Sequence, residues 1–126
     1  MIFVLEYDII TPLEGDDFMT VKELAEKLAL KTLCEDDTAR EINGAYTGDL
    51  LSWVMGRAKS DNVWVTIMSN VNVVAVASLC DVSMVILSEN SVLDSDAMEK
   101  ARIQGINIYS SEMTSYELCA KISTMI

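Results

Sequence analysis

The sequence contains no histidine. Histidine is the side chain whose unperturbed pKa lies closest to neutral pH, and it is the general base in Ser-His-Asp and Cys-His enzymes. Its absence excludes those catalytic arrangements and also histidine-ligated metal sites. No residue in the chain pairs a nucleophile with its own base, so we expect a protein that is not an enzyme, with no catalytic residues and no metal ligands.

Cysteine and proline are also scarce. The three cysteines, Cys34, Cys80 and Cys119, lie 46 and 39 residues apart without a CxxC pair, which favours thiols in a reducing compartment over a disulfide framework. One proline and five glycines exclude collagen-like and linker-like chains. The longest apolar runs, 1–5 and 73–77, are too short to span a membrane, and no basic segment precedes the first of them. We therefore expect a cytoplasmic protein with no membrane partner.

Basic residues are few as well. The 9 Lys+Arg stand against 20 Asp+Glu, so the formal net charge is −11, and the basic residues are scattered from Lys22 to Lys121. Such a surface repels a phosphate backbone, so nucleic acid is not an expected partner. Apolar residues, in contrast, make up 51% of 126 residues, and the mean hydropathy is +0.27. This composition predicts one globular domain with a buried core and apolar surface left over for self-association.

The first 18 residues differ from the rest of the chain. They contain five acidic residues and no lysine or arginine. Met19 then opens a helix signal in which Thr20 and Glu23 form a T-x-x-E capping box. Residues 1–18 are compatible with an N-terminal arm appended to the domain, which we favour, or with an extra β-strand that ends at the turn 12–15. The domain itself is predicted to cover residues 19–126.

Strand-like and helix-like patterns alternate along that domain. Strands are predicted at 31–34, 63–68, 84–87 and 106–109, and residues 43–49, with two glycines, are predicted to form a loop. Helices are predicted after Thr20, after a cap at Asp49, after a cap at Asn72, from Ser95 to Gln104 with Gly105 as its end, and from the T-x-x-E box of Thr114 and Glu117. Trp53 and Trp64 are assigned to the core. The fold class is therefore α/β, with a mostly parallel sheet and helices on both faces.

Small polar side chains follow three consecutive predicted strands. They are Ser69, Asn70 and Asn72, then Ser88, Glu89, Asn90 and Ser91, and then Ser110, Ser111 and Glu112. Ligands of open parallel sheets bind beyond the carboxyl ends of the strands, where helix N-termini attract phosphates and carboxylates. Helix capping explains such residues equally well, and we favour it for any single loop. Together the three loops form a candidate binding rim.

The loop 44–49 is a second candidate. Its glycines, Gly44 and Gly48, let backbone N–H groups approach an anion, and Tyr46 offers a stacking surface. It is not a P-loop, because no lysine follows Gly48 and Asp49 occupies the position where that lysine should be. Arg40 is either paired with a nearby acid, which we favour, or a ligand for an anion. The candidate ligand-binding residues are therefore Arg40, Gly44, Tyr46, Thr47, Gly48, Asp49, Ser69, Asn70 and Asn72.

The segment from Arg40 to Tyr46, REINGAY, followed by TGDLLS to Ser52, resembles the signature of DRTGG domains, and the stretch from VWVTIM to SMVIL is also similar to that family. Of the name-giving residues, Arg40 and Gly44 match, whereas Ala39, Asn43 and Ala45 replace Asp, Thr and Gly. The resemblance covers residues 19–126. It implies a fold similar to the N-terminal domain of HPr kinase/phosphorylase and a role like that of DRTGG modules in some phosphotransacetylases and pyrophosphatases. It does not imply kinase activity, because the catalytic P-loop of HPr kinase lies in its other domain.

These observations lead to one main hypothesis and one alternative. The main hypothesis is a non-catalytic regulatory domain that forms homodimers and senses a nucleotide or another small anionic metabolite, without a resident cofactor. The alternative is an interaction subunit that docks on a larger partner protein. A phosphoryl-transfer enzyme is disfavoured, because no lysine is placed to neutralise a transferred phosphate.

Overall fold

The computed structural model describes residues 18–126, and the predictions for residues 1–17 lie outside this range. The elements are α1 (Val21–Lys27), β1 (Lys31–Cys34), β2 (Gly44–Thr47), α2 (Leu51–Arg57), β3 (Asn62–Thr66), α3 (Val71–Cys80), β4 (Met84–Leu87), α4 (Ser95–Gln104), β5 (Ile108–Ser110) and α5 (Ser115–Ile122). The strands form one sheet in the order β1-β5-β4-β3-β2. Strands β2 to β5 are parallel, and β1 pairs antiparallel with β5. The fold is α/β, as the sequence predicts.

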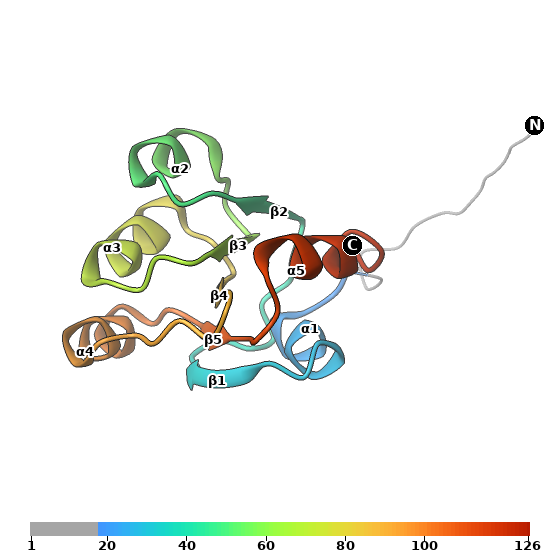
Figure 1. Ribbon diagram of the computed structural model, residues 1–126, viewed down its shortest axis with the longest axis horizontal. Coiled ribbons are helices and arrows are strands. Elements are labelled where there is room, and N and C mark those ends of the chain that lie inside the picture. The colour runs from blue at the N-terminus through green and yellow to red at the C-terminus, as the bar shows by residue number, and fades with distance from the viewer. Residues whose placement is uncertain (1–17) are drawn as a thin grey trace, which may run out of the picture.

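Helices cover both faces of this sheet (Figure 1). Strands β2, β3, β4 and β5 are neighbours in the sheet in the same order as in the sequence. Because the connections between parallel strands are right-handed, the three connecting helices α2, α3 and α4 lie on the same face of the sheet. Helices α1 and α5 pack on the opposite face. The two outer strands of the described sheet are β1 and β2, each paired on one side within residues 18–126.

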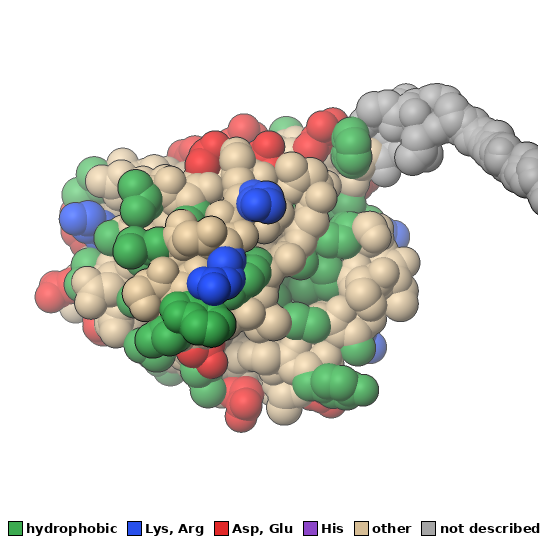
Figure 2. All heavy atoms as spheres, turned by 90° about the horizontal axis from the view of Figure 1, so that it is seen from above, with side chains coloured by type: hydrophobic (Ala, Val, Ile, Leu, Met, Phe, Trp, Pro, Cys, Tyr) green, Lys and Arg blue, Asp and Glu red, His purple; other side chains and the backbone are tan. Residues whose placement is uncertain are grey.

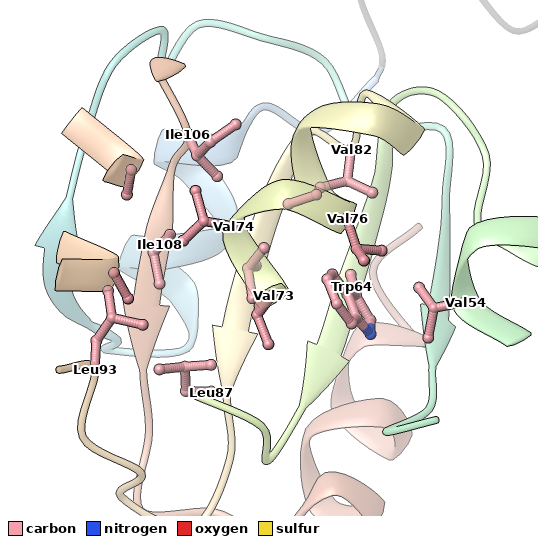
Figure 3. Close-up of a cluster of buried hydrophobic side chains, with 14 residues drawn as sticks. Val54, Trp64, Val73, Val74, Val76, Val82, Leu87, Leu93, Ile106 and Ile108 are labelled. Atoms are coloured by element: carbon pink, nitrogen blue, oxygen red, sulfur yellow. The ribbon is translucent and has the colours of Figure 1, made fainter. Parts of the chain in front are cut away.

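Two apolar clusters hold these layers together. The larger one lies between the sheet and α2, α3 and α4, where Trp64 of β3 packs with Val54, Val73 and Val76 (Figure 3). The smaller one lies under α1 and α5 and includes Tyr109. All five residues of β3 are buried, because a central strand of a parallel sheet is covered on both faces. The near-continuous apolar sequence of this strand follows from that position.

The helix ends match the sequence signals in most places. Both T-x-x-E boxes form. In each box the threonine hydroxyl accepts a hydrogen bond from the backbone N–H of the glutamate, and the glutamate carboxylate accepts one from the backbone N–H of the threonine. Helix α4 ends at Gly105 with φ +69°. A Cβ at Gly105 would lie 3.2 Å from the Asp36 carboxylate, so both backbone conformation and space require glycine there.

Several predictions were wrong in detail. Residues 43–49 are not simply a loop, because 44–47 form the edge strand β2. Asn70, not Asn72, caps α3, and α2 begins after Leu50 without a side-chain cap. Trp53 is 56% exposed rather than buried. The strands predicted at 63–68 and 106–109 are shifted to 62–66 and 108–110.

The stretch 73–80 of α3, VVAVASLC, is apolar nearly all round, and this pattern alone predicts a helix buried on all sides. Its inner residues are fully buried, but Leu79 is 70% exposed and Val71 is 37% exposed. A helix that packs on one face of a three-layer domain has an outer face, whatever its sequence. The exposed apolar surface of α3 is therefore a property of the molecule that the sequence pattern did not reveal.

Candidate ligand site at the carboxyl edge of the sheet

The carboxyl ends of the four parallel strands meet at one edge of the sheet, which we call the carboxyl edge. The loops that leave it are residues 48–50 after β2, 67–70 after β3, 88–94 after β4 and 111–114 after β5. In open parallel sheets this edge is where ligands bind. The strand-end residues that the sequence singled out therefore do lie along a common edge.

Backbone and side-chain hydrogen bonds join neighbouring loops of this edge. The Ser91 hydroxyl donates to the carbonyl of Ile67 at 2.9 Å, and the backbone N–H of Asn90 donates to the carbonyl of Ser111 at 2.7 Å. The loops after β3, β4 and β5 thus form one connected wall. A ligand at this wall would contact several loops at once.

Asp49 is used by the fold itself. Its carboxylate accepts from the buried Thr66 hydroxyl at 2.7 Å and from the backbone N–H of Ile67 at 3.0 Å. It therefore fixes the end of β3 instead of capping α2, contrary to the prediction. A buried hydroxyl and a strand-end N–H are satisfied by one carboxylate.

Two further polar groups at the end of β2 are also bonded within the fold. The Gly48 carbonyl accepts from the indole N–H of Trp64 at 3.0 Å, and the Thr47 hydroxyl donates to the carbonyl of Val65 at 3.0 Å. The Tyr46 ring lies so close to Gly48 that a Cβ there would be 3.0 Å from it. The two glycines of 44–49 thus serve close packing more than an open anion cradle.

The loop after β3 is less committed. The Asn70 side chain accepts from the backbone N–H of Asn72 at 2.9 Å and caps α3. Ser69 is half-buried, and its hydroxyl has no hydrogen-bond partner among residues 18–126. This loop lies at the β3 end of the wall, with Asn72 exposed beside it.

Two adjoining hollows open at the β5 end of the same edge, with volumes of about 310 and 290 Å³. Both are lined by Lys31, Asn90 and Ser110. The sequence placed Asn90 and Ser110 at strand ends but did not predict that Lys31 would lie at the same edge. Because β1 runs antiparallel to β5, its first residue lies at the carboxyl edge, directly opposite Ser110. No local sequence signal specifies that strand order.

A solved structure has the same fold as this chain. It is the regulatory region of Clostridium perfringens pyrophosphatase, comprising CBS and DRTGG domains and crystallised with its activator diadenosine tetraphosphate. The superposition has a TM-score of 0.73 at 9% sequence identity and covers 89% of this chain and 49% of the other, so this chain spans about half the length of its neighbour. The chain has a DRTGG-like fold. No protein-family model and no curated protein matches the sequence.

The signature residues of the DRTGG resemblance lie at the opposite edge, the amino edge, where the parallel strands begin. Gly44 pairs in register with Asn62 at the start of β3. The Arg40 guanidinium contacts the carboxylates of Asp61 at 2.8 Å and Asp81 at 2.9 Å. Arg40 is thus paired with acids, as we favoured. The length of β2, about 10 Å, separates this edge from Thr47, so the candidate residues do not form one site.

The ion cluster around Arg40 is closed by further bonds. The Ser60 hydroxyl donates to Asp81 at 2.7 Å, and Arg40 also donates to the carbonyl of Asp81. The hydrogen bond from Ser60 and then those from Arg40 hold the pKa of the Asp81 carboxyl below its usual range, although burial opposes them. Arg40, which matches the arginine of the DRTGG signature, therefore links the chain before β2 to Asp61 just before β3 and to Asp81 just after α3.

Other chemical possibilities are limited in the described part of the chain. No three Cys, Asp or Glu side chains among residues 18–126 converge as metal ligands. In the same range no helix is both long and apolar enough to cross a membrane. Glu35, which belongs to the acidic segment 35–37, accepts from the Tyr109 hydroxyl at 2.8 Å. Burial and this carboxylate raise the pKa of Tyr109 above its usual value.

Proposed function

We propose that this DRTGG-like domain is a non-catalytic regulatory module that senses a small anionic metabolite at the carboxyl edge and works as a homodimer. The observation that carries the proposal is the connected wall of hydroxyl and amide side chains at that edge, next to two hollows lined by Lys31. These side chains supply hydrogen-bond donors and Lys31 supplies a positive charge, while Glu89, Asp94 and Glu112 of the same loops carry negative charge.

The state of the cysteines supports a non-catalytic role. Burial raises the pKa of the Cys34 and Cys80 thiols. A nucleophilic cysteine needs the reverse, a lowered pKa that maintains the thiolate at neutral pH. The Thr66 hydroxyl donates to the Asp49 carboxylate, but Thr66 is fully buried and out of reach of a substrate. These groups are therefore poor starting points for covalent catalysis.

The candidate ligand residues are Ser69, Asn70 and Asn72 in and after the loop that follows β3. Thr47, Gly48 and Asp49 lie on the same edge, but their polar groups are bonded within the fold, and the Tyr46 ring packs against Gly48. Arg40 and Gly44 are left out of the proposed pocket, because a ligand at this edge does not reach them. The solved neighbour binds a nucleotide activator, so nucleotides are the first ligand class to test.

The test is a thermal-shift screen of the full chain. The panel contains adenine nucleotides, diadenosine tetraphosphate, NAD(H), coenzyme A thioesters and acyl phosphates. A ligand present at 100 times its dissociation constant stabilises the fold by about 2.7 kcal/mol, which is about 10 °C for a domain of this size. The variant Asn70→Ser keeps the helix cap but loses the amide, so it separates binding from folding. No shift with any compound at millimolar concentration would contradict the sensing role.

The homodimer proposal rests on the β2 edge. Within the described sheet β2 pairs only with β3, and its sequence GAYT contains none of the charged residues or prolines that usually protect an edge strand. On one side of it lie the exposed Leu50, Trp53 and Met55, and on the other a hollow of about 230 Å³ against α5. Figure 2 looks onto this edge, with apolar side chains gathered over α2 and toward α5 and acidic ones mostly at the periphery.

A second copy fits this surface because a two-fold axis through β2 would pair two copies of the same uncharged strand antiparallel. Sedimentation equilibrium of the full chain should show a dimer at micromolar concentration. Trp53→Ser and Ala45→Lys should weaken it, since one removes exposed apolar area and the other puts a charge on the strand edge. Leu79→Ser on α3, a similarly exposed position, is the control. A monomer at high micromolar concentration, or a dimer lost only in the control, would contradict the proposal.

The alternative function is an interaction subunit. The observation that favours it is the exposed Trp53, whose ring carries the Arg57 guanidinium at 4.0 Å from its centroid. Tryptophan and arginine are common anchors of protein interfaces. A monomer that gains no stability from any metabolite would support this role over the first one.

A further inference from the structure

The hollow between β1, β5 and the loop 88–94 contains a buried polar group that the fold leaves unused. Ser110 is only 4% exposed, yet its hydroxyl makes no hydrogen bond to any of residues 18–126. Most buried hydroxyls in proteins have a partner, because leaving one unpaired costs stability. Ser110 lines both hollows of the carboxyl edge, so the missing partner belongs in that space.

A positively charged residue lines the same hollows as this hydroxyl. Lys31 and Ser110 are direct cross-strand partners, and such partners project from the same face of a sheet. The Lys31 ammonium forms no ion pair within the described part of the chain, in a protein where acids outnumber basic residues by more than two to one. The charge is thus available to a ligand.

The rest of the hollow favours an apolar group. Leu33, Leu93 and Met98 form its wall, and Asn90 stands at its rim next to Lys31. The Asn90 backbone is held by its bond to Ser111 and has φ +59°, a conformation that asparagine tolerates better than most residues. Its side-chain amide has no hydrogen-bond partner among residues 18–126.

We propose that this hollow binds a small metabolite with an oxyanion head, a carboxylate or a phosphate, on an apolar body. The Lys31 ammonium and the Ser110 hydroxyl hold the head, the Asn90 amide donates to it from the rim, and the apolar wall contacts the body. The proposal rests on the sensing role proposed above and assigns it to particular residues. A volume of about 290 Å³ accommodates a head and a small body but not a whole dinucleotide.

A substitution at Glu112 tests whether the hollow prefers a negatively charged ligand. It lines only the adjoining hollow, on the other side of Lys31 and Ser110, and its carboxylate opposes a bound anion from there. Glu112→Gln should therefore tighten binding of an anion by about two- to threefold. It should not tighten binding of a neutral compound of the same shape.

The experiment is a two-dimensional amide NMR titration of the full chain with inorganic phosphate, phenyl phosphate, phenylacetate and the neutral benzyl alcohol. We expect saturable shifts at Lys31, Asn90, Ser110 and their neighbours, with phenyl phosphate and phenylacetate binding more tightly than inorganic phosphate. Lys31→Met, which keeps the length of the side chain, should weaken the anions about tenfold. Lys59→Met, an exposed lysine at the amino edge, should leave them unchanged.

Two results would overturn the proposal. One is shifts spread over many lysines and reduced equally by Lys31→Met and Lys59→Met, which is non-specific ion binding. The other is a saturable footprint at residues 47–49 and 69–72 alone, which would leave the sensing role standing and move its site. If the thermal-shift panel and the four probes all fail to bind, the sensing role and this site are both wrong. Lys31 is exposed, so its substitution does not endanger the fold.

Discussion

The two edges of the sheet differ in how completely their polar groups are used. At the amino edge Arg40 contacts two carboxylates and a carbonyl, and the buried Ser83 hydroxyl donates to the carbonyl of Asn62 at 2.9 Å. At the carboxyl edge the buried Ser110 hydroxyl has no partner among residues 18–126, and nearby Lys31 is without an ion pair there. The amino edge is built for stability, whereas the carboxyl edge retains unused donors at the place where parallel sheets bind ligands.

The difference also assigns roles to the DRTGG-like signature. Arg40 and Gly44, the two name-giving residues that match, both lie at the amino edge. In this chain the signature arginine joins segments that are far apart in the sequence, since its partners Asp61 and Asp81 precede β3 and follow α3. Matching the signature therefore supports the fold more directly than it supports a ligand.

The largest expected effect comes from breaking the amino edge. Arg40→Met leaves Asp61 and Asp81 facing one another without a cation, and we expect the free energy of unfolding to fall by about 2 kcal/mol. Urea unfolding at neutral pH measures it. The matched control is Arg102→Met, which breaks the single exposed pair with Glu99 and should cost under about 0.5 kcal/mol. Equal losses in the two variants would show that the amino edge is no more than a surface ion pair.

The next effect tests a part of the carboxyl edge that the fold does use. Asp49→Ala removes the acceptor of the buried Thr66 hydroxyl and of the Ile67 N–H, and we expect a loss of about 1.5 kcal/mol. Asp49→Asn keeps one side-chain oxygen and should lose less. Unfolding curves of both variants check this order. If Asp49→Ala is as stable as the original chain, Asp49 is free to bind a ligand and the β2 loop belongs in the open part of the edge.

A matched pair of serines compares the two edges directly. Ser83 and Ser110 are both buried, but only Ser83 has a hydrogen-bond partner in the described residues. Ser83→Ala should cost about 1 kcal/mol, whereas Ser110→Ala should leave stability unchanged or raise it slightly, because it removes an unpaired buried hydroxyl. Thermal unfolding of the two variants under identical conditions makes the comparison. A loss in Ser110→Ala as large as that in Ser83→Ala would mean that this hydroxyl does have a partner and that the carboxyl edge is as filled as the amino edge.

The sequence predicted those parts of the fold whose signals are local. The strands 31–34 and 84–87, the helix 95–104 with Gly105, and both T-x-x-E boxes are found where predicted. In each case a capping side chain, a left-handed glycine or a short apolar run acts within a few residues. These signals do not depend on what packs against them.

Other features depend on contacts between distant segments. Residues 44–47 form a strand only because β3 lies beside them, so their glycine-containing sequence indicated a loop. Lys31 enters the carboxyl edge only because β1 inserts next to β5 in antiparallel orientation. Asp49 was predicted as a helix cap because no local pattern showed that Thr66 would lie within reach. The sequence thus predicted the strand-end loops of the candidate site but not Lys31, the residue that gives the site a positive charge.

The smallest effect concerns acid. Because the pKa of Asp81 is lowered in the folded chain, mainly by Ser60 and then by Arg40, its contribution to stability is complete above the unfolded pKa of about 3.9 and is lost as the pH falls through the folded value. Stability at pH 7 should therefore be unaffected by this group's titration. Asp81→Asn should flatten the dependence of unfolding free energy on pH below about pH 4, measured by urea unfolding from pH 2.5 to 7.

The same measurement on Ser60→Ala and Arg40→Met separates the two causes, since each variant removes one of them. Both should reduce the acid dependence in part, because Ser60 lowers the pKa of Asp81 through one hydrogen bond and Arg40 lowers it through a hydrogen bond and its positive charge. If the acid dependence were unchanged in all three variants, the contacts of Asp81 with Ser60 and Arg40 would be too weak to lower its pKa. Ser110→Ala, at the other edge, removes no titrating group and should leave the slope as it is.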